Sequence, residues 1–576
     1  MNSKKYKNIL YPTREVKDLR ELVYSSASLY PKKTAYLIKE RPGGKYKPVK
    51  YCRVKADMEC LGTGFYKLGL GGKKIAVIGE NSYEWVLTYL ATVNGTGVIV
   101  PLDKELPVNE LIGLLQRAKV SAVVYSKKCA KSVIEAVSQV EGIEYTICMK
   151  EERDEKSLWL YDIMELGREA LVSGDRRFKN AKIDADAMCT LMFTSGTTGL
   201  AKGVMLSHKN IVSNVVNMSK YVKIREDGVG LSVLPMHHAY EMTCHIFTAF
   251  YQGMTVAICE GLKYISKNMA EAKVTVMLGV PLIFENMQKK VMKSAAAKGK
   301  LEQMQKMMEL SKKTKLYNNQ LVMRKMFASV HEGTGGHVEL FIAGGAAINP
   351  KVSEDFQALG FPMLQGYGMS EYAPIIAVNR DRYSKPASVG QPLPGTKVKI
   401  IDKDERGIGE IIVKGPSMML GYYENPEATA EAIRDGWLYT GDYGYMDSDG
   451  YLYISGRKKN VIVTKNGKNI FPEEIEALLL ETEYIAECLV HGVPDEKSGD
   501  TIVKAEVYPD YNLIRSDLGN LTEAEIEHLM NRLVDDVNDK MPAYKRVARV
   551  GVRKTEFEKT TTRKVKRHTQ GNLGPQ

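Results

Sequence analysis

Residues 188–193, MCTLMF, run directly into residues 194–203, TSGTTGLAKG. The first run is short and apolar and predicts a buried strand, whereas the second holds three glycines, four hydroxyl side chains and one lysine in ten positions. Glycine allows close backbone approach, so successive N–H groups can converge on an anion while the hydroxyls and the lysine add donors and charge. The GxxxxGK[ST] pattern of a P-loop is not satisfied. The segment therefore predicts a phosphate-binding loop after a strand.

Short apolar runs alternate with helical patterns on both sides of this segment. The expected strands lie at residues 74–81, 98–103, 122–126, 229–235, 255–260, 274–280 and 337–345. Helical patterns follow them, for example at residues 84–95 and 130–140. This alternation predicts βαβ units and a largely parallel sheet, so we expect a layered α/β fold in the N-terminal three-quarters of the chain.

The pattern changes near Pro392, where strand-like runs are separated by turn signals. Such runs at residues 396–402, 409–415 and 451–456 predict a β-rich subdomain over about residues 385–457. Further strand-like runs and two helical patterns then form a smaller unit. We expect a large domain of residues 1–457, a small α+β domain of residues 458–567 and a disordered tail of residues 568–576.

The composition is that of a multidomain globular protein. The 576 residues exceed what one hydrophobic core can hold, and 44% are hydrophobic and 26% charged. No run approaches the roughly 20 apolar residues of a spanning helix, and the first residues lack the apolar stretch of a signal peptide, so we expect a cytoplasmic protein. The eight cysteines form no CxxC pair, which argues against a zinc site and favours buried, reduced thiols.

The net charge of +12 would suit nucleic acid, anionic lipid or a polyphosphate ligand. Residues 289–325 hold eleven Lys and Arg against two acids, and residues 545–567 hold ten against two. Neither stretch has a pattern of interleaved aromatic residues and no nucleic-acid-binding module is present, which argues against a nucleic-acid partner. The first stretch is a solvated helix face or a membrane contact, so a peripheral position on the inner face of the membrane stays open.

The segment at residues 194–203 resembles the [ST]SG[ST]TGxPKG signature of the adenylate-forming superfamily of acyl-CoA synthetases, with Ala201 where proline is usual. The resemblance implies a large domain of layered α/β subdomains with a β-rich subdomain, and a small mobile α+β C-terminal domain. It also implies a loop that holds the ATP phosphates while a carboxylate attacks the α-phosphorus and pyrophosphate leaves. The residues concerned are Thr194, Ser195, Gly196, Thr197, Thr198, Gly199 and Lys202.

The segment QGYGMSE, residues 365–371, resembles the GYGxTE element of the same family. The resemblance implies that Tyr367 stacks on adenine, that Ser370 bonds phosphate and that Glu371 binds Mg²⁺, a hard cation that prefers oxygen ligands. Such a turn alone is more often a helix cap, but the GGA run at residues 344–346 resembles the adenine-pocket segment and favours the site. The implied ATP-binding residues are Gly344, Gly345, Ala346, Gly366, Tyr367, Gly368 and Ser370.

Two segments of the β-rich part continue the resemblance. YTGD, residues 439–442, resembles YxTGD, in which Asp442 would accept hydrogen bonds from the ribose hydroxyls. SGRKK, residues 455–459, resembles the GRxxD/K segment, in which Arg457 would contact the nucleotide and Lys459 would be the hinge. A β-turn with a surface salt bridge is the alternative for each.

PMHHAY, residues 235–240, resembles the PxxH segment that lines the acyl pocket, with His238 as the functional histidine. In isolation, a structural histidine pair is the favoured alternative. A metal site is disfavoured because only Cys244 and His245 stand near ligand spacing.

EKTTTRKVKR, residues 558–567, resembles PxTxxGKxxR, which implies that Lys564 is catalytic. Its cation would neutralise the charge that develops at the α-phosphate in the transition state. Arg563 and Glu558 depart from the usual glycine and proline, and a basic tail is the alternative.

The order of these elements implies that acyl-AMP forms first and that coenzyme A then displaces AMP, with the small domain rotating about Lys459 between the steps. ATP, Mg²⁺ and coenzyme A are the expected cofactors and co-substrates. The opening segments, the basic insertion and the TTTRKVKR ending look most like bacterial long-chain fatty acid CoA ligases. Acyl carrier protein as acceptor and a medium-chain or aromatic acid stay open. A nucleotide-binding protein without catalysis is disfavoured by the presence of Glu371, Asp442, Arg457 and Lys564.

Overall fold

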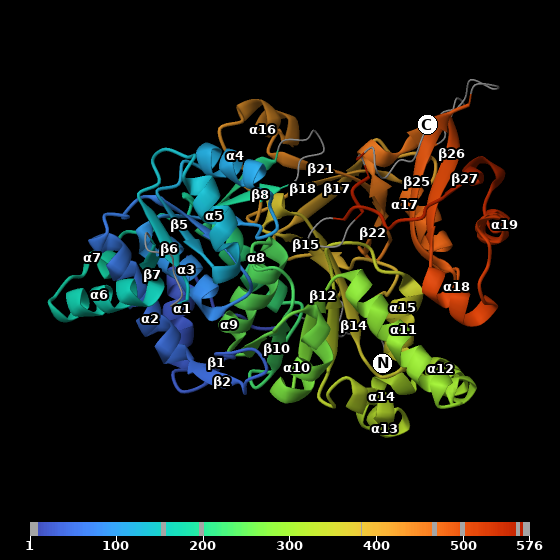
Figure 1. Ribbon diagram of the computed structural model, residues 1–576, viewed down its shortest axis with the longest axis horizontal. Coiled ribbons are helices and arrows are strands. Elements are labelled where there is room, and N and C mark those ends of the chain that lie inside the picture. The colour runs from blue at the N-terminus through green and yellow to red at the C-terminus, as the bar shows by residue number, and fades with distance from the viewer. Residues whose placement is uncertain are drawn as a thin grey trace. The chain divides into compact units, whose positions relative to one another are not determined.

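The computed structural model (Figure 1) describes residues 10–150, 157–194, 201–381, 383–463, 469–495, 501–559, 565–567 and 569. The chain divides into a larger compact unit, Met1–Lys397 with Val413–Leu438, and a smaller one, Val398–Ile412 with Tyr439–Gln576. The chain therefore passes between the units three times. The predicted domain boundary between residues 457 and 458 marks the expected hinge, whereas the two units are defined by compactness. The boundary stays a prediction.

The first sheet of the larger unit has eight strands in the order β19-β9-β8-β4-β3-β5-β6-β7. Its strands are β3 (Lys74–Ile78), β4 (Val98–Leu102), β5 (Ala122–Tyr125), β6 (Tyr145–Cys148), β7 (Leu158–Trp159), β8 (Met188–Thr194), β9 (Lys202–Ser207) and β19 (Gly421–Tyr422). The strands from β8 to β7 are parallel, whereas β9 and β19 are antiparallel to their neighbours.

The second sheet has nine strands in the order β16-β15-β14-β13-β12-β10-β11-β1-β2. Its strands are β1 (Thr34–Ile38), β2 (Lys47–Lys50), β10 (Val229–Ser232), β11 (Thr255–Ile258), β12 (Val276–Gly279), β13 (Leu340–Ala343), β14 (Met363–Gly368), β15 (Ile375–Val378) and β16 (Gln391–Pro392). Its six central strands are parallel, and every strand expected from the apolar runs is present. The layered α/β fold that the sequence predicted is therefore present, with its strands divided between two sheets. Local patterns do not specify which strands pair.

Helices of the larger unit connect and cover the strands of its two sheets, as βαβ connections require. They are α1 (Leu19–Leu29), α2 (Tyr51–Lys67), α3 (Tyr83–Ala91), α4 (Val108–Ala118), α5 (Ala130–Val137), α6 (Leu160–Val172), α7 (Arg177–Asn180), α8 (His208–Ser219), α9 (Thr248–Gln252), α10 (Ile265–Ala272), α11 (Pro281–Ala297), α12 (Leu301–Thr314), α13 (Gln320–Met326), α14 (Ala328–Gly333), α15 (Pro350–Ala358) and α16 (Pro426–Ala432). The π-helix η4, Tyr240–Phe247, leads directly into α9.

The basic insertion folds as the helices α11 to α14, drawn in green and yellow-green in Figure 1. Methionine dominates its inner side: Met304, Met308 and Met323 are buried, and Met287, Met292, Met307 and Met326 are partly buried against the same core. Eight lysines of the insertion are exposed and form no ion pair with any described residue. They are Lys289, Lys290, Lys293, Lys298, Lys300, Lys313, Lys315 and Lys325.

The smaller unit is rich in strands, as the sequence predicted. Its first part is a sheet of β17 (Lys397–Ile401), β18 (Gly409–Lys414), β21 (Trp437–Met446) and β22 (Leu452–Arg457). β20 (Ile433–Arg434), which pairs with the start of β21, belongs to the larger unit. The last part of the smaller unit has β23 (Ile462–Val463), β24 (Asn469–Ile470), β25 (Ile485–Pro494), β26 (Thr501–Pro509), β27 (Val547–Val552), α17 (Pro472–Leu479), α18 (Tyr511–Leu518) and α19 (Glu523–Asn538). α18 and β27 were not among the elements predicted from the sequence. Of the predicted tail, His568 and residues 570–576 lie outside the described residues.

Two expectations about the whole chain can be compared with the structure. Within the described ranges, no helix is long and apolar enough to cross a bilayer. All eight cysteines are free thiols, but Cys52 is exposed and Cys244 is half-buried. The expectation of buried thiols is therefore wrong for Cys52, which lies on the solvent side of the first turn of α2.

Candidate active site

The β8–β9 hairpin holds the two ends of the predicted phosphate loop together. Thr194 ends β8 and Lys202 begins β9, and the two residues are paired across the hairpin. The Thr194 hydroxyl donates to the backbone carbonyl of Lys202 at 3.4 Å. The other predicted loop residues, Ser195, Gly196, Thr197, Thr198 and Gly199, lie outside the described residues.

A tyrosine that the sequence analysis did not single out connects this hairpin to the predicted magnesium ligand. Tyr422 lies on β19, which pairs with β9, and its ring centroid is 5.0 Å from the ammonium of Lys202. The Tyr422 hydroxyl donates to Glu371 Oε1 at 2.9 Å, and the backbone N–H of Met419 donates to the Glu371 carbonyl at 2.9 Å. Lys202 and Glu371 are therefore brought to the same place from different sheets.

The two glycine segments lie side by side at the carboxyl ends of parallel strands. Residues 344–346 follow β13 and residues 366–368 end β14, and the two strands pair in parallel at Ala343 and Gln365. Gly345 has a φ of 83°, in the left-handed region that favours glycine. Ligands of open α/β sheets bind at this edge, so the placement suits the nucleotide role that the sequence implied.

Close packing fixes the turn that carries Glu371. A Cβ at Gly368 would lie 2.0 Å from the carbonyl oxygen of Pro374, so only glycine fits there. Asn214 of α8 donates to the Ile375 carbonyl at 2.9 Å and accepts from its N–H at 3.2 Å. These contacts hold both sides of the 3₁₀ turn η7, Ser370–Tyr372. Tyr367, before the turn, is half-buried.

The predicted histidine segment follows β10 and is fixed by Asn81. The Asn81 amide donates to the Leu234 carbonyl at 2.7 Å and its oxygen accepts from the Met236 N–H at 3.1 Å. The rings of His237 and His238 are 4.0 Å apart. Burial lowers the pKa of His237 to about 3, so this ring is neutral near pH 7. The role of His238 at an acyl pocket stays a prediction.

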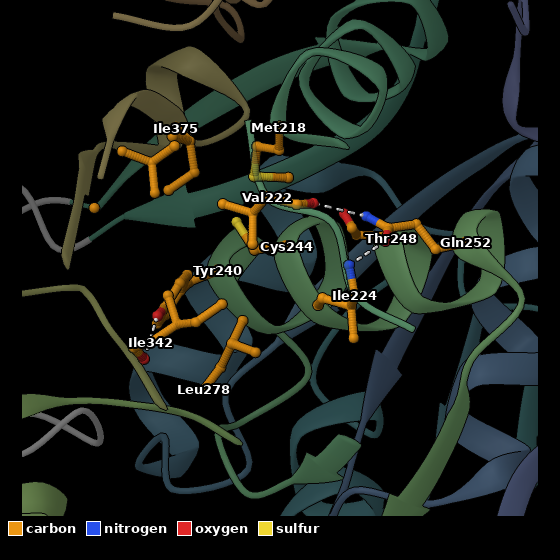
Figure 2. A pocket seen from close by; sticks show the side chains of 12 residues that line it. Met218, Val222, Ile224, Tyr240, Cys244, Thr248, Gln252, Leu278, Ile342 and Ile375 are labelled. Carbon is orange, nitrogen blue, oxygen red and sulfur yellow. Dashed lines mark hydrogen bonds between the residues drawn. The ribbon is translucent and has the colours of Figure 1, made fainter. Parts of the chain in front are cut away.

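A small apolar pocket of about 40 Å³ lies beside the glycine segments (Figure 2). Gly366 is part of its wall, and Tyr240 stands at the same end. The Tyr240 hydroxyl donates to the Ile342 carbonyl at 3.1 Å. A Cβ at Gly344 would lie 2.7 Å from Tyr240 Cζ, so the ring packs directly beneath the predicted adenine segment.

In the smaller unit, the predicted ribose ligand is paired with the predicted nucleotide contact. Asp442 on β21 lies opposite Arg457 on β22, and Asp442 Oδ1 is 2.9 Å from Arg457 Nε. The Asp442 side chain is 6% exposed and that of Arg457 is 54% exposed. Lys459 follows in the short 3₁₀ helix η8, Lys458–Asn460. The hinge role of Lys459 stays a prediction.

Lys564 lies outside the described residues, but the chain on both sides of it is held by ion pairs. Lys559 and Val565 form an isolated antiparallel bridge. Lys559 pairs with Glu487, and Arg567 pairs with Glu476. Burial raises the pKa of the Glu476 carboxyl, an effect that the Arg567 guanidinium opposes. The catalytic role of Lys564 stays a prediction.

The described side chains fit Mg²⁺ bound together with a nucleotide. No group of three or more metal-ligating side chains occurs within the described part of the chain. Mg²⁺ is usually held by one or two carboxylates together with substrate phosphates. Glu371 supplies such a carboxylate, and Lys202 supplies a cation close to it.

Comparison with known proteins identifies the family of the chain. The family model "AMP-binding enzyme" matches residues 23–423, and "AMP-binding enzyme C-terminal domain" matches residues 474–564. Fatty acyl-CoA synthetase B of Dictyostelium discoideum is 29% identical over 480 residues, 78% of this chain and 70% of that protein. A long-chain-fatty-acid–CoA ligase of Bacillus subtilis (strain 168) is 28% identical over 524 residues, 84% of each chain.

A solved structure shares the fold of the whole chain. ATP-bound MatB from Rhodopseudomonas palustris has a TM-score of 0.71 and 25% identity, covering 96% of this chain and 98% of that one. The family match spans more than half of the chain and contains the phosphate-loop hairpin, both glycine segments and Glu371. The chain belongs to the AMP-binding enzyme family, and the C-terminal domain of that family follows its main domain.

Proposed function

We propose that the protein uses ATP to convert a carboxylic acid to acyl-AMP and pyrophosphate, and then transfers the acyl group to coenzyme A with release of AMP. The observation that carries this proposal is the common location of Lys202, Tyr422 and Glu371 on elements from two sheets. A cation and a carboxylate held together suit a magnesium nucleotide. Membership of the AMP-binding enzyme family supports the same reaction.

Different side chains bind the phosphates and the ribose of ATP. Lys202 contacts the outer phosphates, Glu371 provides an oxygen ligand for Mg²⁺, and the Tyr422 hydroxyl orients that carboxylate. Bound Mg²⁺ would shield phosphate charge. Asp442 accepts hydrogen bonds from the ribose hydroxyls, and the Lys564 cation offsets the charge that develops at the α-phosphate during adenylation.

The acid is an alkyl acid, and its hydrocarbon part occupies the apolar pocket. The polar side chains of the wall are bonded within the protein: Tyr240 to Ile342, Thr248 to the Thr243 carbonyl at 2.8 Å, and Gln252 to residues 219–224. A polar group on the acid would therefore be buried without a partner, which is unfavourable. The similarity to a fatty acyl-CoA synthetase supports a fatty acid, and the similarity to a long-chain-fatty-acid–CoA ligase supports a long chain.

The experiment is exchange of labelled pyrophosphate into ATP with straight-chain acids of graded length, aromatic acids and hydroxylated analogues. Acid-dependent exchange that is strongest with unsubstituted alkyl acids is expected. Absence of exchange with every acid would overturn the proposal. Product analysis with coenzyme A and with acyl carrier protein in parallel then identifies the acceptor, and a thioester formed only on the carrier protein would overturn the second step.

The insertion supports a peripheral contact with an anionic membrane as part of the same proposal. Its eight exposed, unpaired lysines are accompanied by exposed leucines: Leu282 is 36% exposed, Leu310 48% and Leu321 77%. Lysines attract anionic headgroups and exposed leucines enter the interface. Co-sedimentation with vesicles that contain anionic lipid, but not with neutral vesicles, is expected. Charge reversal at Lys289, Lys290 and Lys293 should reduce it, and equal binding to both vesicle types would refute the electrostatic contact.

A further inference from the structure

One helical face runs along the whole apolar pocket. Tyr240, Cys244, Thr248 and Gln252 recur at every fourth position through η4 and α9, so they share a face and all of them line the pocket. Figure 2 shows Tyr240 and Ile342 at one end and Gln252 at the other. Twelve residues of α-helix would span about 18 Å, so the row is long relative to a single side chain.

The Tyr240 end borders the predicted nucleotide segments, because its ring packs against Gly344 and because Gly366 forms part of the wall. An acid whose carboxylate is activated must have its carboxyl group at this end. The Gln252 end is therefore where the last carbons of its chain arrive.

The Gln252 end is closed by the segment that follows α8. Val222 and Ile224 of this segment line the pocket. The Gln252 oxygen accepts from the Ile224 N–H at 3.0 Å, and its amide donates to the Val222 carbonyl at 3.3 Å and to the Ser219 hydroxyl at 3.0 Å. One side chain thus bonds two groups of the closing segment and the last residue of α8, and it fixes the segment against the end of α9 (Figure 2).

We infer that Gln252 sets the longest acyl chain that the enzyme accepts, by holding residues 222–224 across the far end of the pocket; the inference rests on the proposed function. A chain that reaches Gln252 cannot extend further without displacing Val222 and Ile224. Displacement breaks the hydrogen bonds of Gln252 and leaves buried polar groups without partners, which opposes binding of longer acids.

The helical face that lines the pocket also indicates where a bulky residue would shorten it. Thr248 lies one helical turn before Gln252, and its hydroxyl is bonded to the Thr243 carbonyl of its own helix. Burial raises the pKa of the Cys244 thiol, so this neighbour is neutral and offers no charge to a polar tail. A phenylalanine at position 248 would fill the space before Gln252 without removing a contact to the closing segment.

The test measures kcat/KM for pyrophosphate exchange across straight-chain acids of graded length. Gln252→Ala removes the hydrogen bonds and volume, and Gln252→Leu removes the hydrogen bonds while keeping the volume. Both should raise the ratio of kcat/KM for long over short acids at least tenfold, and Thr248→Phe should lower it by a similar factor. Gln139→Ala is the matched control and should leave the profile unchanged, because Gln139 is exposed after α5 and its side-chain amide donates to the Glu135 carbonyl.

The outcomes separate this inference from the proposed function. If the wild-type protein exchanges pyrophosphate and the Gln252 and Thr248 variants, folded by their thermal midpoints, keep its chain-length profile, the role of Gln252 is refuted. If both Gln252 variants fail to fold, the Thr248→Phe variant provides the test. An unchanged chain-length profile in this variant refutes the pocket as the acyl site. If the wild-type protein shows no exchange with any acid, the proposed function fails instead.

Discussion

Removal of the Tyr422 hydroxyl tests the contact between the phosphate-loop hairpin and Glu371. Tyr422→Phe keeps the ring beneath Lys202 but deletes the 2.9 Å hydrogen bond to Glu371 Oε1. Tyr422 is 8% exposed, so water replaces the lost donor poorly. A hydrogen bond to a charged group contributes about 1.5–3 kcal/mol, and each 1.36 kcal/mol is tenfold in rate, so a roughly 10–100-fold loss in kcat/KM for ATP is expected.

The assay is acid-dependent pyrophosphate exchange with ATP and Mg²⁺ varied independently. If Glu371 binds Mg²⁺, the variant should also require more Mg²⁺ for half-maximal activity. Tyr423→Phe is the matched control, because Tyr423 lies on the next position with its ring 5.3 Å from the Lys74 ammonium. Equal kcat/KM and equal Mg²⁺ requirement in the two variants would refute the positioning role of Tyr422.

Three further changes test other parts of the molecule. Lys564→Ala should abolish pyrophosphate exchange while thioester formation from supplied acyl-AMP continues; equal loss of both half-reactions would contradict a role confined to adenylation. Asp442→Asn should raise the KM for ATP roughly tenfold or more through loss of a charged acceptor, and 2′,3′-dideoxy-ATP should abolish the difference from wild type; a persisting difference would place Asp442 elsewhere. Burial lowers the pKa of His208 to about 4, and its Nδ1 accepts from the Leu19 N–H. The unfolded chain binds this proton below about pH 6.5, so folding stability is complete above that pH and falls by about 3 kcal/mol as the pH drops toward 4. His208→Asn keeps an acceptor and should reduce the difference in thermal midpoint between pH 7 and pH 5; an unchanged difference would refute a buried neutral histidine.

Elements with a strong local pattern could be predicted from the sequence. The run at residues 122–126 became β5, and the helical pattern at 130–140 became α5. Alternation of such runs also predicts parallel pairing, which β3, β4 and β5 show. Which strands join which sheet could not be predicted. β8 pairs with β4 through Ile99 and Thr190, which lie 91 positions apart in the sequence, and this pairing depends on tertiary packing.

The candidate site likewise contains residues that a local pattern predicts and residues whose role depends on tertiary packing. Thr194 lies at the end of the predicted strand, and Lys202 lies beside it because the two ends of a hairpin are close in sequence, although the strand that Lys202 begins was not predicted. Tyr422 is 51 positions from Glu371, and a tyrosine in a short strand has no local signal that distinguishes a contact to a carboxylate from ordinary packing. Gln252 was missed for a similar reason, because its role depends on the segment after α8 rather than on its own helix.

The methionine side of the insertion has a chemical consequence. Oxidation converts methionine into a polar, chiral sulfoxide, and such a group no longer suits an apolar interior. Met304, Met308 and Met323 lie in one cluster with partly buried methionines around them, so peroxide that reached these sulfurs would loosen α11 to α14 from their sheet. The core around β3 and β5 is built mainly from valine, leucine and alanine and would resist the same treatment. Of these two cores, oxidation would therefore disrupt the packing of the helices that carry the exposed lysines, and methionine sulfoxide reductase would reverse it.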